Sequence, residues 1–254
     1  MKFFVVSDVH SFYDEMIAAL KEKNFELDNP EHQIIVCGDL FDRGPDARKT
    51  LDFMKRMHKE GRFHYVCGNH EELLFDCIQD IIRGRGISSH HYHNGTVDTI
   101  VQLTGINKYD LDMRLFDFQK FNEDISEVTD FISECAVDYV EIGDYIFVHG
   151  WIPAYANIED FRNASADDWS QARWENGMRM WHNPHCRVPG KTVVCGHYHC
   201  SWGHSHLRQT HKEFPNKSLK NWKESFEPFI DEGIVAIDAC TAYSGICNCW
   251  VLEV

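Results

Sequence analysis

Short apolar runs that end in clusters of polar residues recur in the N-terminal part of the chain. β-Branched and aromatic residues dominate these runs, which is typical of buried strands, and the Gly, Asp and Asn residues after them are typical of loops. The runs and the loops that follow them are Phe3–Val6 with Ser7–His10, Ile34–Val36 with Cys37–Gly44, and Phe63–Cys67 with Gly68–Glu71.

Segments with apolar residues at helical spacing separate these runs. The spacing predicts helices over 12–23, 46–60 and 71–83. Strands that alternate with helices are joined by right-handed crossovers, so the strands are expected to be parallel in one sheet of an α/β fold. Because ligands bind at the C-terminal ends of strands in open α/β sheets, we expect the polar loops to form a site there.

The C-terminal half contains further strand signals. The pattern over 137–148 predicts a hairpin with Gly143-Asp144 as its turn, and 191–195 predicts a strand that opens onto Gly196-His197. Segments 234–238 and 247–254 are expected to be antiparallel strands that close a second sheet. Since no repeat or low-complexity linker divides the sequence, a single domain over 1–254 is expected.

Residues 84–136 differ from the rest, because no expected strand in this stretch ends in polar residues of the metal-binding type. Gly84-Arg85-Gly86 breaks the preceding helix, and apolar residues then recur at helical spacing. We expect a helical insertion that lies over the site and governs substrate access. Within it, Ser88–His93 has the composition of a metal cluster, but it has few apolar neighbours in sequence, so a solvated polar loop is expected.

Composition is ordinary for a soluble globular protein, with 43% hydrophobic and 26% charged residues. The formal net charge of −15 argues against nucleic acid as a partner, because binding to phosphate backbones needs many Lys or Arg contacts. No segment approaches the ~20 apolar residues of a membrane span, and the apolar run before Asp8 is too short for a signal peptide. We therefore expect a cytoplasmic protein with no membrane partner.

The ten cysteines are scattered, which argues against a disulfide scaffold in a chain of this length. Cys200, Cys247 and Cys249 are a candidate thiolate metal site, but no Cys-x-x-Cys pair supports it. The cysteines that end apolar strands are expected to be buried small hydrophobic residues: Cys37, Cys67 and Cys195.

The expected site is rich in oxygen and imidazole groups. Without cations, so many acidic and imidazole groups at one sheet edge would repel one another or stay protonated. Divalent cations are the simplest explanation, because carboxylate, amide oxygen and imidazole suit Mn, Fe or Zn. The strand-end side chains concerned are Asp8, His10, Asp39, Asp42, Arg43, Asn69 and His70.

The order and spacing of these loops resemble the metal motifs of the calcineurin-like metallophosphoesterases. The Asp-Arg-Gly ending and the Glu after Asn-His are similar to the phosphoprotein phosphatase branch of that family. The resemblance implies an α/β sandwich of two mixed β-sheets flanked by helices, in the order α-β-β-α. The matching motifs are Asp8-x-His10, Gly38-Asp39-x-x-Asp42-Arg43-Gly44, Gly68–Glu71, Val148-His149-Gly150 and Cys195–His199.

The resemblance also implies two divalent metal ions as cofactors, with Mn expected and Fe, Zn or Mg as alternatives. Asp39 would bridge the two ions and fix their separation at ~3.5–4 Å. Relatives with Gly-His-x-His use the last His on the first ion, so His199 is an expected extra ligand. The implied ligands are Asp8, His10 and Asp39 for the first ion, and Asp39, Asn69, His149 and His197 for the second.

In the mechanism that the resemblance implies, water between the two ions loses a proton, and the hydroxide attacks phosphorus in line. His70 would be the general acid that protonates the leaving alkoxide, with Asp42 as its partner. Arg43 would hold phosphate oxygens with two hydrogen bonds. A second phosphate contact is assigned to Arg173 by its order in the chain, with Arg179 as the alternative.

We therefore expect a metal-dependent phosphatase that hydrolyses phosphomonoesters, either phosphorylated Ser/Thr proteins or small phosphoesters. A dinucleoside polyphosphate hydrolase, for example one that cleaves diadenosine tetraphosphate, shares the fold and most of these motifs and is the first alternative. A non-catalytic scaffold is a further alternative, although the motifs lack none of their ligands and retain the acid.

Overall fold

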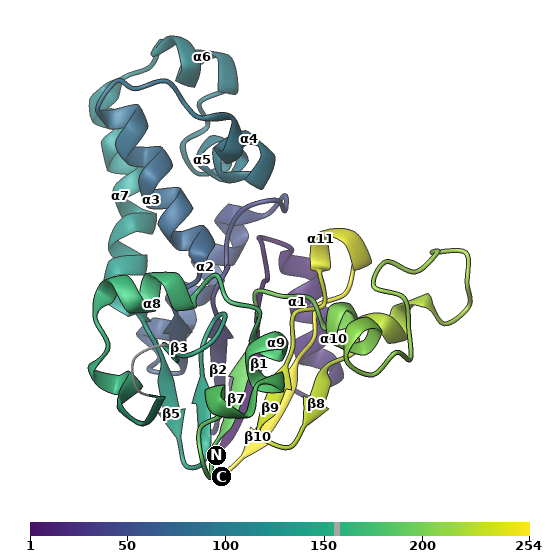
Figure 1. Cartoon of the computed structure of the whole chain (residues 1–254). Helices are drawn as coiled ribbons and strands as arrows, with labels where there is room; N and C mark the ends of the chain where they lie inside the picture. The colour runs from purple at the N-terminus through teal and green to yellow at the C-terminus, as the bar shows by residue number, and fades with distance from the viewer. Residues whose placement is uncertain (155–157) are drawn as a thin grey trace.

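A computed structural model describes residues 1–154 and 158–254, and over these residues the strands form two sheets (Figure 1). The first sheet contains β1 (Lys2–Val6), β2 (His32–Cys37), β3 (Phe63–Val66), β4 (Ala136–Val137) and β10 (Trp250–Glu253). Its order is β10-β1-β2-β3-β4. The predicted parallel pairing is confirmed, because β1, β2 and β3 are parallel neighbours.

The second sheet contains β5 (Val140–Ile142), β6 (Tyr145–Phe147), β7 (Thr192–Cys195), β8 (Phe229–Asp231) and β9 (Ile234–Ala236). Its order is β5-β6-β7-β9-β8. β5 and β6 form the predicted hairpin, in which Ile142 pairs with Tyr145 across Gly143-Asp144. β7 is parallel to both β6 and β9, so its C-terminal end lies between theirs.

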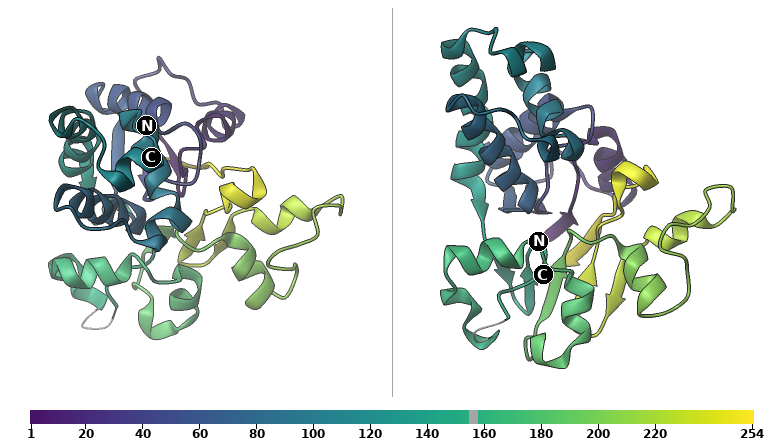
Figure 2. Two further views of the ribbon diagram at one scale, coloured as in Figure 1. Left: turned by 90° about the horizontal axis from the view of Figure 1, so that it is seen from above. Right: turned by 45° about the horizontal axis from the view of Figure 1, so that its top comes forward.

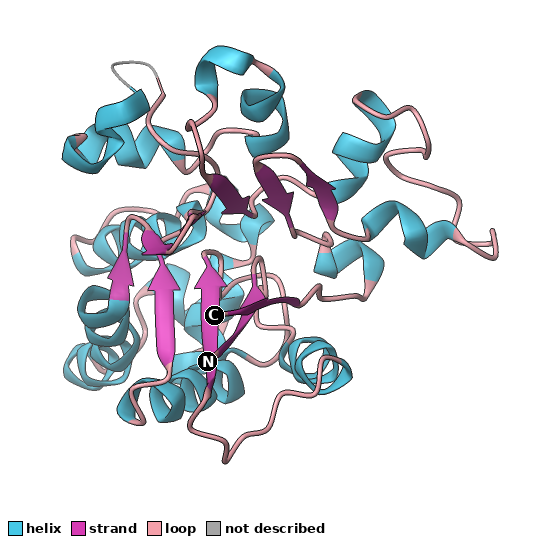
Figure 3. Cartoon of the chain, turned by 90° about the horizontal axis from the view of Figure 1, so that it is seen from below, coloured by secondary structure: helices cyan, strands magenta, loops and turns pink. Residues whose placement is uncertain are grey.

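The two sheets pack face to face, and helices cover their outer faces (Figure 3). Alternation along β1 explains this arrangement. Phe3 and Val5 join Phe147 and Val194 in the apolar layer between the sheets. Phe4 and Val6, which alternate with Phe3 and Val5 along the strand, face the helices on the other side of the sheet. A strand buried on both faces reads as a continuous apolar run, as this one does. The α/β class with two mixed sheets flanked by helices is confirmed.

Helices on the outer face of the first sheet include α1 (Tyr13–Glu22), α2 (Ala47–Lys59) and α3 (Asn69–Ile82). Their bounds lie within two residues of those predicted from the apolar spacing. The second sheet is covered by α8 (Ala166–Ala172), α9 (Gly177–His182) and α10 (Cys200–His206). Shorter elements are the 3₁₀ segments Ile158–Asn163, Pro184–Cys186 and Trp222–Phe226, and α11 (Thr241–Ser244).

The stretch expected to be an insertion folds into α4 (Ser89–Asn94), α5 (Thr96–Thr104), α6 (Lys108–Met113) and α7 (Phe118–Cys135). α4, α5 and α6 lie at the top of the molecule in Figure 1, and α7 runs down from them toward the sheets; the right view of Figure 2 shows the same arrangement. The prediction of a solvated loop over Ser88–His93 is wrong, because this segment is mostly helical and His91 is fully buried. Tyr92 of this segment packs against a core cluster that contains Ile100 and Phe121.

The predicted pairing of the last two strands is also wrong. β9 lies in the second sheet, whereas β10 pairs antiparallel with β1 in the first. β10 fills the edge beside β1, and the N-terminal amine of Met1 donates to the carbonyl of Val254 at 2.7 Å. An alternating pattern identifies a strand but not its partner, which explains the error. Among the described residues, no helix is long and apolar enough to cross a membrane.

The cysteines do not form a thiolate site. Cys247 and Cys249 pack in the core of the first sheet, whereas Cys200 packs in that of the second. Within the described ranges, no group of potential metal ligands contains a cysteine. Cys37 and Cys195 are buried as expected.

Candidate metal centre

The loops after β1, β2 and β7 hold an uncommon backbone conformation. A positive φ is rare for residues other than glycine and costs about 1–3 kcal/mol, so the surrounding structure must hold it in place. Strain of this kind clusters at functional sites. The residues concerned and their φ angles are Asp8 (49°), His10 (49°), Asp39 (54°), Asp42 (74°), Arg43 (65°) and His197 (62°).

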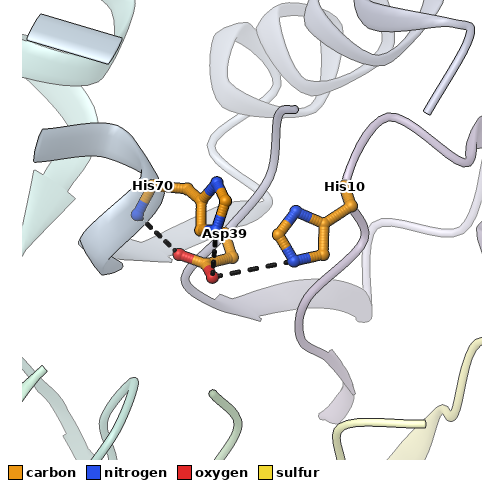
Figure 4. A group of neighbouring side chains, drawn as sticks. All are labelled: His10, Asp39 and His70. Carbon is orange, nitrogen blue, oxygen red and sulfur yellow. Dashed lines mark hydrogen bonds and ion pairs between the residues drawn. The ribbon is translucent and has the colours of Figure 1, made fainter. Parts of the chain in front are cut away.

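Asp39 lies between two histidines (Figure 4). Its Oδ2 is 3.7 Å from Nε2 of His10 and 3.9 Å from Nε2 of His70. His10 donates its Nδ1 proton to the carbonyl of Phe41 at 2.8 Å, so its Nε2 carries a lone pair. Burial, and then the charges of Arg43 and His70, lower the pKa of His10 well below its usual range. This imidazole is therefore neutral, as a metal ligand must be.

The other carboxylate oxygen of Asp39, Oδ1, faces a second group of potential metal ligands. Asp39 Oδ1 lies 3.3 Å from Nε2 of His149, and Asn69 Oδ1 lies 2.8 Å from the same nitrogen. His149 donates its Nδ1 proton to the carbonyl of Cys37 at 2.8 Å. Burial by itself lowers the pKa of His149, but Asp39 outweighs it and raises the pKa to about 10. Two oxygens thus converge on one ring nitrogen, where a cation can replace the proton.

His197 completes the second group. Its potential ligand atom and those of Asp39 and His149 all lie within 4.8 Å of one another. Burial, followed by His149, lowers the pKa of His197 to about 3, so its ring is neutral. Its backbone N–H donates to Oδ2 of Asp8 at 2.9 Å. A Cβ at Gly196 would lie 2.2 Å from that oxygen, so only glycine permits this approach.

Asp8 is buried near a carboxylate that sequence reasoning did not assign, Asp238. Burial, and then the charge of Asp238, raise the pKa of Asp8 well above its usual range. Burial also raises the pKa of Asp238, which accepts the backbone N–H of Cys240 at 2.6 Å. Neighbouring buried carboxylates need a proton or a cation. The signal that would have found Asp238 is the one that found Asp8, a carboxylate directly after an apolar strand.

His70 pairs with Asp42 at the start of α3. His70 Nδ1 lies 2.7 Å from Oδ2 of Asp42, and both side chains are buried. A carboxylate only accepts, so Nδ1 carries the proton, and Nε2 accepts from Arg43 Nη2 at 2.9 Å. Arg43 Nη1 lies 2.9 Å from His10 Nε2, so the guanidinium spans both histidines. The structure thus brings together the three residues expected to act on the phosphoryl group.

Glu71 is a second residue to which sequence reasoning gave no role. Its fully buried carboxylate accepts the backbone N–H groups of Asp39 at 3.0 Å, Leu40 at 2.9 Å and Gly68 at 2.7 Å. These contacts tie the loop after β2 to the start of α3. Glu71 therefore holds the backbone around Asp39 in position, and it belongs to neither group of potential metal ligands found in the described residues.

Arg173 and Arg179, the candidates for a second phosphate contact, are placed differently from each other. Arg173 is mostly buried and forms ion pairs with Glu72 and Asp138. Arg179 lies exposed on α9. The geometry therefore gives Arg173 two carboxylate partners that a phosphate would have to displace.

His199 lies at the N-terminus of α10 and is directed toward other partners. Its Nδ1 lies 2.9 Å from the hydroxyl of Ser201, and its Nε2 lies 3.5 Å from a carboxylate oxygen of Glu213. His199 belongs to neither of the two groups of potential ligands found in the described residues.

The donor set fits divalent cations. Two groups of potential ligand atoms, His10–Asp39–His70 and Asp39–His149–His197, share Asp39. Carboxylate and imidazole suit Mn, Fe and Zn. The Nδ1 atoms of His10 and His149 donate to backbone carbonyls, as the second nitrogen of a metal-bound histidine usually does. The residues that would hold two ions are therefore gathered around one shared carboxylate.

Fold and site together define an α/β sandwich protein with a strand-end centre built for divalent cations. The family model for calcineurin-like phosphoesterases matches residues 1–228. The chain therefore belongs to the calcineurin-like phosphoesterase family.

Curated relatives match about a third of the chain. An asymmetrical bis(5'-nucleosyl)-tetraphosphatase PrpE of Bacillus velezensis is 35% identical over 81 residues, which cover 30% of this chain and 32% of that protein. A symmetrical bis(5'-nucleosyl)-tetraphosphatase of Photorhabdus laumondii is 33% identical over 85 residues, 34% of this chain and 30% of that protein. The matched region thus spans about a third of the length of each relative.

Solved structures share the fold over nearly the whole chain. A structure described as a candidate diadenosine tetraphosphatase covers 99% of this chain and 89% of its own, with a TM-score of 0.51 and 13% identity. A cold-active protein-tyrosine phosphatase of a psychrophilic Shewanella species covers 99% and 75%, with a TM-score of 0.50 and 14% identity. At these identities the likeness concerns the fold alone.

Proposed function

We propose that this protein is a phosphoesterase that uses two divalent metal ions to hydrolyse phosphoric esters. The observation that carries the proposal is the shared carboxylate of Asp39, which faces both groups of potential ligands. The His70–Asp42 pair and Arg43 lie beside it. Family membership supports this reaction class.

Each part of the site has a proposed task. Asp8, His10 and Asp39 would hold one ion, and Asp39, Asn69, His149 and His197 the other. The ions would supply an activated water and would neutralise charge on the phosphoryl oxygens. Manganese is our proposal for the native metal.

The remaining residues act on the phosphoryl group and the leaving group. Arg43 presents two N–H donors on one face and would orient phosphate oxygens. His70, when it is also protonated at Nε2, would donate that proton to the leaving oxygen and become neutral, and Asp42 would stabilise the positive charge of the ring before the transfer. Asp42 accepts the Nδ1 proton of His70, which leaves Nε2 as the atom that exchanges a proton.

Phosphorylated proteins and dinucleoside polyphosphates are the two classes of substrate that we consider. The curated relatives named as bis(5'-nucleosyl)-tetraphosphatases favour the second class. Trp174 also favours it, because 51% of this residue is exposed and its ring lies edge-on to His197 at 5.9 Å. An exposed indole beside the centre offers a face on which a base can stack.

A substrate panel tests the proposal. Purified protein with Mn²⁺ should hydrolyse p-nitrophenyl phosphate, lose activity on chelation and regain it when Mn²⁺ is restored. Protein with a full complement of metal that leaves every phosphoester intact would overturn it.

A comparison of diadenosine tetraphosphate with a phosphoserine peptide distinguishes the two substrate classes. Trp174→Ala should raise KM for the dinucleotide by about 5-fold or more, the worth of one stacked base, and should leave KM for the peptide unchanged. Trp174→Phe keeps an aromatic face and is the matched control. A KM that rises equally for both substrates would remove the argument for stacking.

A further inference from the structure

The α5 helix of the insertion contacts the loop that carries Asp42 and Arg43. Thr96 and Thr99, three residues apart on one face of the helix, both reach the Asp42 side chain. One turn further on, Gln102 donates to the carbonyl of Gly44 at 2.9 Å and accepts the backbone N–H of Ala47 at 2.8 Å. The insertion therefore holds both ends of this loop.

The carboxylate of Asp42 is fully buried, and both of its oxygens have partners. Oδ2 accepts from His70 Nδ1 at 2.7 Å and from Thr96 Oγ1 at 2.8 Å. Oδ1 accepts from Thr99 Oγ1 at 2.8 Å. Three donors thus fix the plane of the carboxylate, and with it the direction of the His70 ring.

The direction of the Thr99 hydroxyl is determined by its surroundings. Its oxygen accepts the backbone N–H of Asp42 at 3.0 Å. The single hydroxyl proton of Thr99 is then free to point at Oδ1 of Asp42. Thr99 therefore binds both the main chain and the side chain of Asp42, and a valine of the same shape could do neither.

The loop itself is strained, so it needs such support. Asp42 and Arg43 both have positive φ angles, 74° and 65°. Such conformations persist only when the surrounding structure holds them. Gly95, between α4 and α5, packs directly on this turn, since a Cβ there would lie 2.4 Å from the backbone nitrogen of Arg43. The insertion supplies the contacts that hold the strained turn in shape.

We propose that Thr96 and Thr99 are positioning residues for the general acid His70, and that the helical insertion serves to hold the Asp42–Arg43 turn. This assignment rests on the proposed phosphoesterase function. It gives the insertion a task in the reaction itself, whereas the sequence indicated only a cover over the site.

The test depends on the leaving group. A poor leaving group, such as the serine alkoxide, needs a proton from the acid, whereas 2,4-dinitrophenolate leaves without one. Loss of the threonine hydroxyls should therefore slow the first substrate and spare the second. A merely structural role would lower both rates together, since it would change only the amount of active protein.

The variants are Thr96→Val, Thr99→Val and the double variant, each beside its Ser counterpart. With Mn²⁺, the double Val variant should lose about 10- to 100-fold in kcat on phosphoserine and less than about 2-fold on 2,4-dinitrophenyl phosphate. The Ser variants keep the hydroxyl and should restore the phosphoserine rate. Thr104→Val on the same helix is the control, because its hydroxyl donates to Ile100 and not to Asp42.

The ratio of the two rates does not depend on the fraction of folded protein, so partial unfolding does not obscure the result. An unchanged ratio in the Val variants, or Ser variants that fail to restore it, would overturn the positioning role. If the proposed phosphoesterase function were wrong, the result would be different, because the unmodified protein would then hydrolyse neither substrate.

Discussion

The strand-end site and the core of the helical insertion both bury histidines, but they surround them differently. In the site, His10 and His149 each donate Nδ1 to a backbone carbonyl and direct Nε2 toward Asp39. In the insertion, His91 is fully buried on α4, and neither ring nitrogen has a hydrogen-bond partner among the described residues. Burial alone therefore does not mark a ligand. A fixed tautomer and a shared carboxylate do.

Among the substitutions that test this comparison, Asp39→Asn in the strand-end site should have the largest effect. The change removes the charge that both groups of ligands share, so both metals should be lost and activity should fall by about 10⁴-fold or more. Metal analysis of the purified variant, together with kcat on p-nitrophenyl phosphate, measures both effects. Asp130→Asn, an exposed position on α7, is the matched control. Retention of two metals in Asp39→Asn would show that Asp39 is not the bridge.

His70→Asn comes next and separates two roles. His70 belongs to one group of potential ligands, yet its other nitrogen is bound to Asp42. If it acts as the acid, kcat on a substrate with a poor leaving group, such as phosphoserine, should fall by about 10²–10⁴-fold while metal content stays near normal. Metal content and kcat are measured on the same sample. A variant that loses one metal would identify His70 as a ligand instead.

Most of the centre follows from local sequence, because its residues sit directly after apolar strands. Asp8, Asp39 and His70 were found in this way. The left-handed backbone of Asp8 and Asp39 was not predicted, since the identity of an Asp residue does not indicate a positive φ. The strands β1, β2 and β3 were equally clear, because strands buried on both faces are continuous apolar runs.

Contacts between distant segments are what the sequence did not provide. Thr96 and Thr99 lie 54 and 57 residues from Asp42 along the chain, and both look like ordinary helix residues. His91 was expected in a solvated loop, because few apolar residues lie near it in sequence, whereas its helix packs through Tyr92 on a core cluster built from other helices. Similarly, β10 was assigned to the wrong sheet, since its partner β1 is at the other end of the chain.

Glu71→Gln should have a smaller effect on the site. Glu71 accepts three backbone N–H groups, whereas a glutamine side chain would turn an NH₂ group toward at least one of these donors. The position of Asp39 should loosen and metal affinity should fall by about 10- to 100-fold, as for other residues that orient ligands. A titration with Mn²⁺ measures it. Glu72→Gln is the adjacent control, since Glu72 pairs with Arg173 instead. Equal affinity in Glu71→Gln and the unmodified protein would refute the orienting role.

His91 gives the smallest effect and tests the other half of the comparison. Burial, followed by the charge of His90, lowers the pKa of His91 below its ordinary value of 6.5. The folded state therefore holds His91 neutral, while the unfolded chain takes up a proton as the pH falls below that value. Stability from this residue is complete above pH ~6.5 and is lost on acidification, by at most about 1.4 kcal/mol per pH unit. The loss ends where His91 is protonated in the folded state.

His91→Met removes the titrating group at similar volume, so its stability should depend less on pH between 7 and 5 than that of the unmodified protein. Urea unfolding at each pH measures the free energy. His93→Gln, at an exposed position on the same helix, is the matched control. Metal content should be unchanged in both variants, because His91 belongs to neither group around Asp39. If His91→Met lost metal, the contrast between a ligand histidine and a packing histidine would fail, since the insertion core would then be coupled to the centre through this ring.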